Sequence, residues 1–163
     1  MTSDYLIGSI SSGTMRPEDL IPVFVDTLDE LKEARSLTTA SDELSAVREF
    51  DRLDTYLAEI EQRQKQEGYY ESDDAQFDLE WLFDELNAFA PPYFYFGAHP
   101  GDGADYGFWL AEGALDDFDG LRVADTSEVP SDYCGEVLHV NDHGNCTLYV
   151  ADQGQLSEIW AIV

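Results

Sequence analysis

The sequence predicts an α+β fold, with a mainly helical half over residues 1–90 and a mainly β half over residues 91–163. In the first half, apolar residues repeat at the spacing of amphipathic helices. Pro91 and Pro92 then end the helical pattern, because proline cannot continue a helix. In the second half, short apolar runs alternate with turn residues, which is typical of an antiparallel meander. We therefore expect a single domain of residues 1–163, in which three helices pack on one face of an antiparallel sheet.

Three amphipathic helices account for the first half. The first follows the candidate N-cap Thr14 and continues to about Arg35, the second follows Ser41 over residues 42–66, and the third covers residues 75–90 after Asp73 or Asp74. Each has an apolar stripe in steps of three and four residues, which an α-helix places on one face. The stripes are Leu20, Phe24, Leu28 and Leu31; Ala46, Phe50, Leu53, Leu57 and Ile60; and Leu79, Leu82, Phe83, Leu86 and Phe89.

Strands are expected where apolar and aromatic runs are bounded by glycine, proline and asparagine. They lie near residues 4–10, 93–97, 106–110, 120–124, 135–140, 146–150 and 156–162. The turn residues 141–145 favour a hairpin in which Val140 pairs with Cys146 and His139 pairs with Thr147. Because successive side chains alternate between the faces of a strand, His139 then points away from Cys146.

The run CGEVLHVNDHGNC suggests a zinc site by composition, but the hairpin opposes it. His139 and Cys146 lie on opposite faces, and Cys134 lies about 20 Å along the strand from Val140, which is too far for a disulfide. We expect no metal, no cofactor and no disulfide, with Cys146 as a small core residue. His143, at the tip of the turn, is the least explained residue of this segment.

The turn-rich loop GAHPGDGADYGFW contains His99, Asp102 and Asp105 between two aromatic runs. A histidine beside a carboxylate can act as an acid–base pair, so these residues and His143 form a candidate loop site. Glycines and short polar side chains are nevertheless sufficient to form a loop that is held by its own hydrogen bonds. We therefore expect no catalytic residue. The alternative is a small enzyme or metal-dependent domain centred on His99, Asp102, His139 and His143.

Charge is the most unusual property of the sequence. Eight lysines and arginines against 35 acidic residues give a net charge of −27. Such a field repels nucleic acid and anionic membranes and attracts basic protein surfaces. Residues 67–85 contain no lysine or arginine, and Arg122 is the only basic residue among the ten acids of residues 102–136. The expected contact surface consists of Glu71, Asp73, Asp74, Asp78, Glu80, Asp84, Glu85, Asp116, Asp117 and Asp119.

Three explanations of this acidity remain open. Carboxylates one helical turn apart are separated by ~5.4 Å, a spacing comparable in scale with that of phosphates, so rows of acids can imitate nucleic acid. The alternatives are a surface adapted to high salt and the solvated surface of an immunity or adaptor protein. Clustering of the acids and the aromatic content of 13% oppose salt adaptation, whereas the presence of only two lysines among the eight basic residues supports it. If mimicry is correct, neutralising Asp78, Glu80 and Asp84 together should weaken binding and leave the fold at least as stable.

Four segments, GTMRPEDLIP, YFGAHPGDGADYGFW, GEVLHVNDHGN and EIWAIV, resemble those of small acidic proteins of phages and other mobile elements. The resemblance covers most of the chain and implies a context rather than an activity or catalytic residues. Such proteins often block host defence or host DNA transactions. In charge and size, the chain is also similar to DNA-mimic antirestriction proteins.

The predicted function is a non-enzymatic inhibitor that occupies a basic surface of a partner protein, such as a DNA-binding host defence protein. No direct binding to nucleic acid or to membranes is expected. The first residues lack the basic and apolar regions of a signal peptide, and no apolar run approaches the ~20 residues of a membrane span. The expected compartment is the cytoplasm, which is that of the host cell if a phage encodes the chain.

Overall fold

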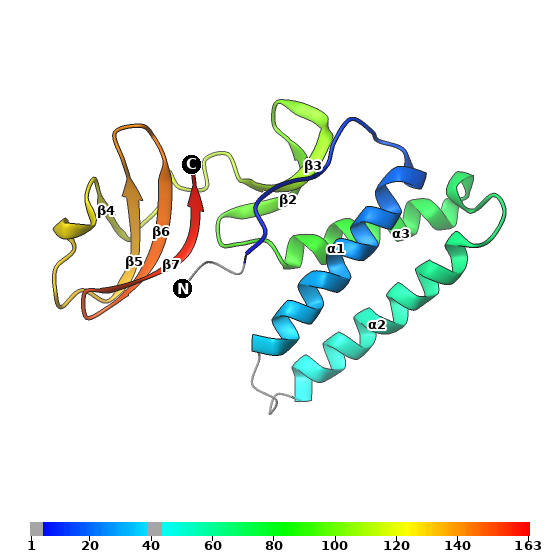
Figure 1. Cartoon of the computed structure of the whole chain (residues 1–163), viewed down its shortest axis with the longest axis horizontal. Coiled ribbons are helices and arrows are strands. Elements are labelled where there is room, and N and C mark those ends of the chain that lie inside the picture. The colour runs from blue at the N-terminus through cyan, green and yellow to red at the C-terminus, as the bar shows by residue number, and fades with distance from the viewer. Residues whose placement is uncertain (1–4, 39–43) are drawn as a thin grey trace. The chain divides into compact units, whose positions relative to one another are not determined.

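The computed structural model describes residues 5–38 and 44–163, and the fold is α+β with helices before most of the strands (Figure 1). The helical elements are α1 (Pro17–Thr38), α2 (Leu44–Gln64), the 3-10 helix η1 (Tyr69–Glu71), α3 (Asp73–Ala88) and the 3-10 helix η2 (Thr126–Glu128). The strands are β1 (Gly8–Ser11), β2 (Phe94–His99), β3 (Asp102–Leu110), β4 (Leu121–Val123), β5 (Gly135–Val140), β6 (Cys146–Asp152) and β7 (Gln155–Ile162). The predicted positions Asp4, Ser41 and Asp42 lie outside the described residues.

The elements form two compact units. The helical unit contains residues 7–90 and 95–109, and the β unit contains residues 91–94 and 110–163 together with Tyr5 and Leu6. The strands also form two sheets rather than the predicted single sheet, with the orders β1-β3-β2 and β4-β5-β6-β7. Apart from the end residues Phe94 and Leu110, the three-stranded sheet belongs to the helical unit. That residues 1–163 act as a single domain stays a prediction.

An aromatic core joins the helices to the three-stranded sheet. The ring of Phe24 in α1 makes edge contacts with Phe83 of α3 and Phe96 of β2, with centroids 5.2 Å apart in each pair. Tyr106 of β3 lies 6.0 Å from Phe24, and Phe108 lies 4.9 Å from Phe96. The aromatic runs on either side of the turn-rich loop therefore contribute to the core of the helical unit.

The N-terminal strand joins this sheet through a close backbone contact. Gly8 pairs with Phe108 and Ser9 with Gly107 in an antiparallel register. A Cβ atom at Gly107 would collide with the carbonyl group of Gly8, so glycine is required there.

The N-cap of α3 differs from the prediction. Ser72, rather than Asp73 or Asp74, is the cap, and its Oγ accepts the N–H of Ala75 at 3.3 Å. The helix consequently starts before the predicted residue 75, and both aspartates lie in its first turn, where acidic side chains interact well with the helix dipole.

The β unit confirms the predicted hairpin and corrects the predicted meander. β5 and β6 pair with Val140 opposite Cys146 and His139 opposite Thr147. β6 and β7 are also antiparallel, but β4 runs parallel to β5. The sheet is therefore mixed. Between β4 and β5, η2 and the segment after it bring the chain back, so that both strands start at the same edge of the sheet and run in the same direction.

Apolar residues are buried on both faces of this sheet. On one face, Val123, Val137 and Ala151 form a buried cluster that is covered by residues including Val129 and Tyr133 from the connection between β4 and β5. On the other face, the cross-strand neighbours Leu138, Leu148 and Trp160 are fully buried. The indole N–H of Trp160 donates to the carbonyl oxygen of Pro92 at 2.9 Å, which ties the segment after α3 to the β unit.

Candidate functional site

The outer face of α3 carries four acidic residues and one aromatic residue. We define the α3 outer face as Asp73, Asp74, Phe77, Glu80 and Asp84, all of which are exposed. Residues four, seven and eleven positions apart return to the same side of a helix, so Asp73, Phe77, Glu80 and Asp84 follow one stripe. Glu71 lies exposed in η1, just before this helix. The acids predicted for this part of the contact surface are therefore accessible, apart from Asp78 and Glu85.

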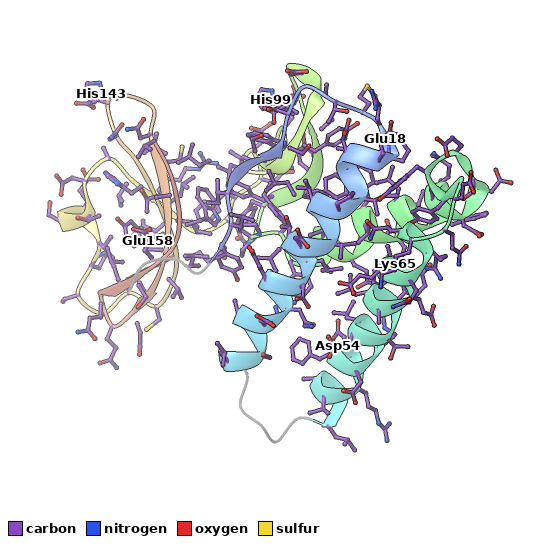
Figure 2. All side chains as sticks on the ribbon, turned by 45° about the vertical axis from the view of Figure 1, so that its right-hand side comes forward. Glu18, Asp54, Lys65, His99, His143 and Glu158 are labelled. Carbon is purple, nitrogen blue, oxygen red and sulfur yellow. The ribbon has the colours of Figure 1, made fainter. Side chains whose placement is uncertain are left out.

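Cations do not compensate the α3 outer face. α3 contains no lysine or arginine, and within residues 5–38 and 44–163 none of its outer acids takes part in an ion pair. Elsewhere in the described part of the helical unit, ion pairs join Arg16 to Glu18 and Asp19, Lys32 to Asp29 and Asp54, Arg52 to Glu85, and Arg63 to Glu59 and Asp78. Figure 2 labels Glu18 on α1 and Asp54 on α2 among these partners. Glu80 and Asp84, in contrast, repel each other and have no ion-pair partner among the described residues.

Asp78 lies in the interior of the helical unit, which corrects its predicted place on the contact surface. The residue is 2% exposed. The guanidinium group of Arg63 in α2 donates from Nε to Oδ2 and from Nη2 to Oδ1, each at 2.8 Å. The hydroxyl groups of Tyr56 and Tyr69 donate to the same carboxylate at 3.1 and 2.7 Å. Asp78 therefore connects α2 and η1 to α3, and neutralising it should destabilise the fold, contrary to the sequence-based prediction.

The Asp78 network also raises the pKa values of its partners. Burial, and then the hydrogen bond to Asp78, raise the pKa of Tyr69 above its ordinary value of 10.0. The hydrogen bond to the same carboxylate raises the pKa of Arg63, because the negative charge stabilises the guanidinium. Since both oxygens of Asp78 already accept two hydrogen bonds, the network is a structural connection rather than a site for a ligand.

Glu85 is also engaged within the fold. Its Oε1 accepts from Nη2 of Arg52 in α2 at 3.0 Å, and its side chain is only 15% exposed. Since its charge is already paired, Glu85 offers little to a partner. The structure therefore removes both Asp78 and Glu85 from the predicted contact surface.

A second group of predicted acids lies in the β unit. Asp116, Asp117 and Asp119 are exposed in the segment between β3 and β4. Residues 110–163 contain eleven acids and a single basic residue, Arg122. Arg122 donates from Nη2 to the carbonyl oxygen of Leu115, and among the described residues it forms no ion pair. The acids of this unit are thus as poorly compensated as the α3 outer face.

The loop between β2 and β3 is held by its own hydrogen bonds. Nδ1 of His99 accepts the N–H of Gly101 at 3.0 Å, and its ring packs edge-on against Trp109 at 4.7 Å. Oδ1 of Asp102 accepts the N–H of Ala104 at 3.0 Å. The structure thus brings His99 and Asp102 into one loop, where each bonds to the backbone. These bonds form a turn. They also occupy Nδ1 of His99, so this nitrogen does not bond to a carboxylate as it would in an acid–base pair.

The other residues of the candidate loop site have separate local roles. Asp105 accepts a hydrogen bond from the hydroxyl group of Ser9 in β1. Nε2 of His139 lies 3.0 Å from a backbone carbonyl oxygen in the segment after β4. His143 is exposed at the tip of the β5–β6 loop, where its N–H donates to Oδ1 of Asn141 at 2.9 Å (Figure 2). His99, Asp102 and Asp105 belong to the helical unit, whereas His139 and His143 belong to the β unit.

Both cysteines are free thiols. Sγ of Cys134 accepts the N–H of Gln153 at 3.3 Å, and Cys146 lies opposite Val140 in the hairpin. In the part of the chain that the structure describes, no three His, Cys, Asp or Glu residues are grouped to hold a metal ion.

Two features of the site were not found by sequence reasoning. Asp78 lies three residues after Ala75 and four before Leu82, both of which are buried, so helical spacing could have assigned it to the inner side of α3. Phe77, in contrast, falls outside the apolar stripe that was predicted for this helix. An aromatic residue on the polar side of an amphipathic helix could therefore have indicated an exposed aromatic side chain.

Comparisons of the chain with protein-family models, with curated proteins and with solved structures find no match. Among the described helices, none combines the length and the apolar character that are needed to cross a bilayer.

Proposed function

We propose that this protein is a non-enzymatic acidic inhibitor, which occupies the basic DNA-binding surface of a host protein and blocks it. The observation that best supports the proposal is the α3 outer face, whose exposed carboxylates lack ion-pair partners among the described residues. Seven other acids of the helical unit do pair with lysine or arginine, and among them are Glu18, Asp54 and Glu59. Because a helix that serves only stability gains from mixed charges, attraction of a cationic partner is the better explanation of this face.

The spacing of these acids suits a cationic surface that normally binds phosphates. Asp73, Glu80 and Asp84 are separated by about 10 and 6 Å along the helix axis, at ~1.5 Å per residue. Duplex DNA presents about one charge per 1.7 Å of its axis, so α3 offers a sparser but similarly linear row. The resemblance to small acidic proteins of phages and mobile elements supports a target in host defence.

Competition with DNA tests this proposal. A host protein that is captured on the immobilised chain is purified, and its affinity for the chain is measured at low and at high salt, with and without duplex DNA. The affinity should fall steeply as salt increases, because screening weakens contacts between charged surfaces. Duplex DNA should prevent binding. A captured protein that binds the chain and DNA simultaneously would contradict the proposal.

A pair of charge-neutralising variants tests the surface itself. Glu80→Gln with Asp84→Asn should weaken target binding by about tenfold, because two attractive contacts are lost. The same change should leave the fold as stable or raise its stability by about 0.2–0.5 kcal/mol, since a repulsive pair is removed.

The matched control is Asp26→Asn with Glu30→Gln on α1, two exposed acids at the same spacing. This variant has the same net charge as the first and should retain nearly all binding. If both double variants lose affinity equally, total charge rather than the α3 outer face determines binding.

A further inference from the structure

Phe77 is exposed in the middle of the acidic stripe of α3. The residue is 65% exposed. Asp73 and Asp74 lie four and three residues before it, and Glu80 lies three residues after it, so all three acids are its neighbours on the helix surface. The phenylalanines at positions 24, 96 and 108 are buried in the core, whereas Phe77 is not part of it.

An aromatic contact connects α3 to α2 close to Phe77 in the sequence. Trp81, one turn after Phe77, is half-buried and stacks on Tyr56 with ring centroids 4.1 Å apart and an angle of 30° between the planes. Tyr56 in turn donates to the buried carboxylate of Asp78. The Tyr56–Trp81 stack and the bonds of Asp78 therefore hold the part of α3 that carries Phe77 against α2.

We propose that the α3 outer face docks a cationic protein surface, with Phe77 inserted into an apolar pocket whose rim carries lysines or arginines. This inference rests on the proposed function and specifies its partner. Aromatic anchors surrounded by polar and charged residues are the usual energetic centre of a protein interface. Charge complementarity defines the occupant, because the acids next to Phe77 require positive groups opposite them.

Other occupants fit this face poorly. A second copy of the chain in a two-fold arrangement would place Asp73, Asp74, Glu80 and Asp84 opposite the same acids, and like charges across an interface are costly. Nucleic acid and anionic membranes are repelled by the same carboxylates. A purely polar cationic segment would match the acids but leave Phe77 in water.

Two synthetic peptides of equal length and charge can test the proposal. One is an amphipathic helix of lysine and leucine, and the other replaces every leucine with serine. The affinity of the whole chain for each peptide is measured by fluorescence anisotropy at low salt. The wild-type chain should bind the lysine–leucine peptide more tightly, because only this peptide offers an apolar surface to Phe77.

Phe77→Ala should weaken binding of the lysine–leucine peptide by at least about tenfold and leave binding of the lysine–serine peptide unchanged. Since Phe77 is exposed, the variant should unfold at the same urea concentration as the wild type. Met15→Ala is the matched control, because Met15 is 64% exposed in the same unit. This control should bind both peptides as the wild type does.

The possible contrary results are distinguishable. If Phe77→Ala changes neither affinity while Glu80→Gln with Asp84→Asn weakens both, the anchor is wrong and the proposed function stands. If the wild type binds neither peptide at low salt, the docking inference fails, whereas the proposed function is decided by the competition with duplex DNA. If the wild type self-associates and Phe77→Ala abolishes this, the occupant is a second copy and the inference is overturned.

Discussion

Asp78 shows how the position of a single carboxylate decides its role. The residue shares the inner side of α3 with Ala75 and Leu82, where an unpaired charge would be costly. Arg63 supplies the opposite charge from α2, and Tyr56 and Tyr69 complete the hydrogen bonds. The acidic sequence around Asp78 predicts that it lies on a binding surface. In the structure, Asp78 instead connects α3 to α2.

Asp78→Asn should lower the free energy of unfolding by about 2–4 kcal/mol, because Arg63 loses its charged partner and the tyrosines lose part of their acceptor. The loss should not exceed that of a fully buried pair, since the side chain of Arg63 retains 23% exposure. Urea denaturation measures the change. Asp84→Asn, an identical substitution at an exposed position of α3, is the control and should change stability by less than about 0.5 kcal/mol. Equal stability of the two variants would show that the Asp78 network contributes nothing.

At the level of elements, Tyr93 links the segment after α3 to strand β5. Its backbone has a φ of 72°, which is unusual for a bulky residue and costs roughly 1–2 kcal/mol. The Tyr93 hydroxyl donates to Oε2 of Glu136 at 2.6 Å, and its carbonyl oxygen accepts the N–H of Ala111 at 2.9 Å. The hydrogen bond to Glu136 raises the pKa of Tyr93 to about 12. These contacts offset the strained backbone and fix the segment within the β unit.

This link should make stability depend on alkaline pH. Unfolded Tyr93 loses its proton near pH 10.0, whereas folded Tyr93 retains it to about 12, so the unfolded state is favoured progressively between these values. Tyr93→Phe should therefore show a smaller loss of stability over this range, measured as the urea midpoint. Tyr133→Phe is the control, because the Tyr133 hydroxyl donates to the uncharged carbonyl group of Glu136. If Tyr93→Phe and the wild type lose stability equally, the bond to Glu136 is not maintained.

Local patterns predicted the elements whose partners are close in sequence. The three helices follow from their apolar stripes and from Pro91 and Pro92. The register of β5 with β6 follows from turn residues 141–145, because the length and type of a short loop fix the pairing of the two strands beside it. The same reasoning correctly separated His139 from Cys146.

Pairings over long distances in the chain were not predictable in this way. The paired residues of β1 and β3 are almost a hundred positions apart in the sequence. The only trace of this pairing in the sequence is the glycine at position 107, where the two backbones approach closely. β4 has three residues, too few to show a pattern, so its parallel pairing with β5 left no signal. The local hydrogen bonds of His99 and Asp102 agree with the predicted loop that is held by its own bonds. The suggestion of an acid–base pair, in contrast, came only from the presence of these residue types in the loop.

At the scale of the whole molecule, the net charge of −27 acts against folding through self-repulsion. The total was known from the sequence, but the structure was needed to show that Asp78 and Glu85 are engaged and that the α3 outer face is not. Net charge alone thus leads to the proposal of a cationic partner, while burial shows which acids are accessible on the surface.

Thermal unfolding at low and high salt should separate binding from salt adaptation. Raising the salt concentration from about 0.01 to 1 M shortens the screening length from ~30 to ~3 Å and should raise the melting temperature. The chain should nevertheless stay folded at the lower concentration, because its buried aromatic residues, such as Phe24 and Trp160, do not depend on screening. Circular dichroism measures both states. Unfolding on removal of salt would favour an acidic surface adapted to high salt.

The burial of Trp160 gives the molecule two separable optical signals. Of its three tryptophans, Trp160 is the only one in the β unit, whereas Trp81 and Trp109 belong to the helical unit. In a chain with Trp81→Phe and Trp109→Phe, indole fluorescence would come from the β unit alone. Conversely, a chain that retains only Trp81 would carry its fluorophore one helical turn from Phe77, so its emission would report directly on what covers that residue.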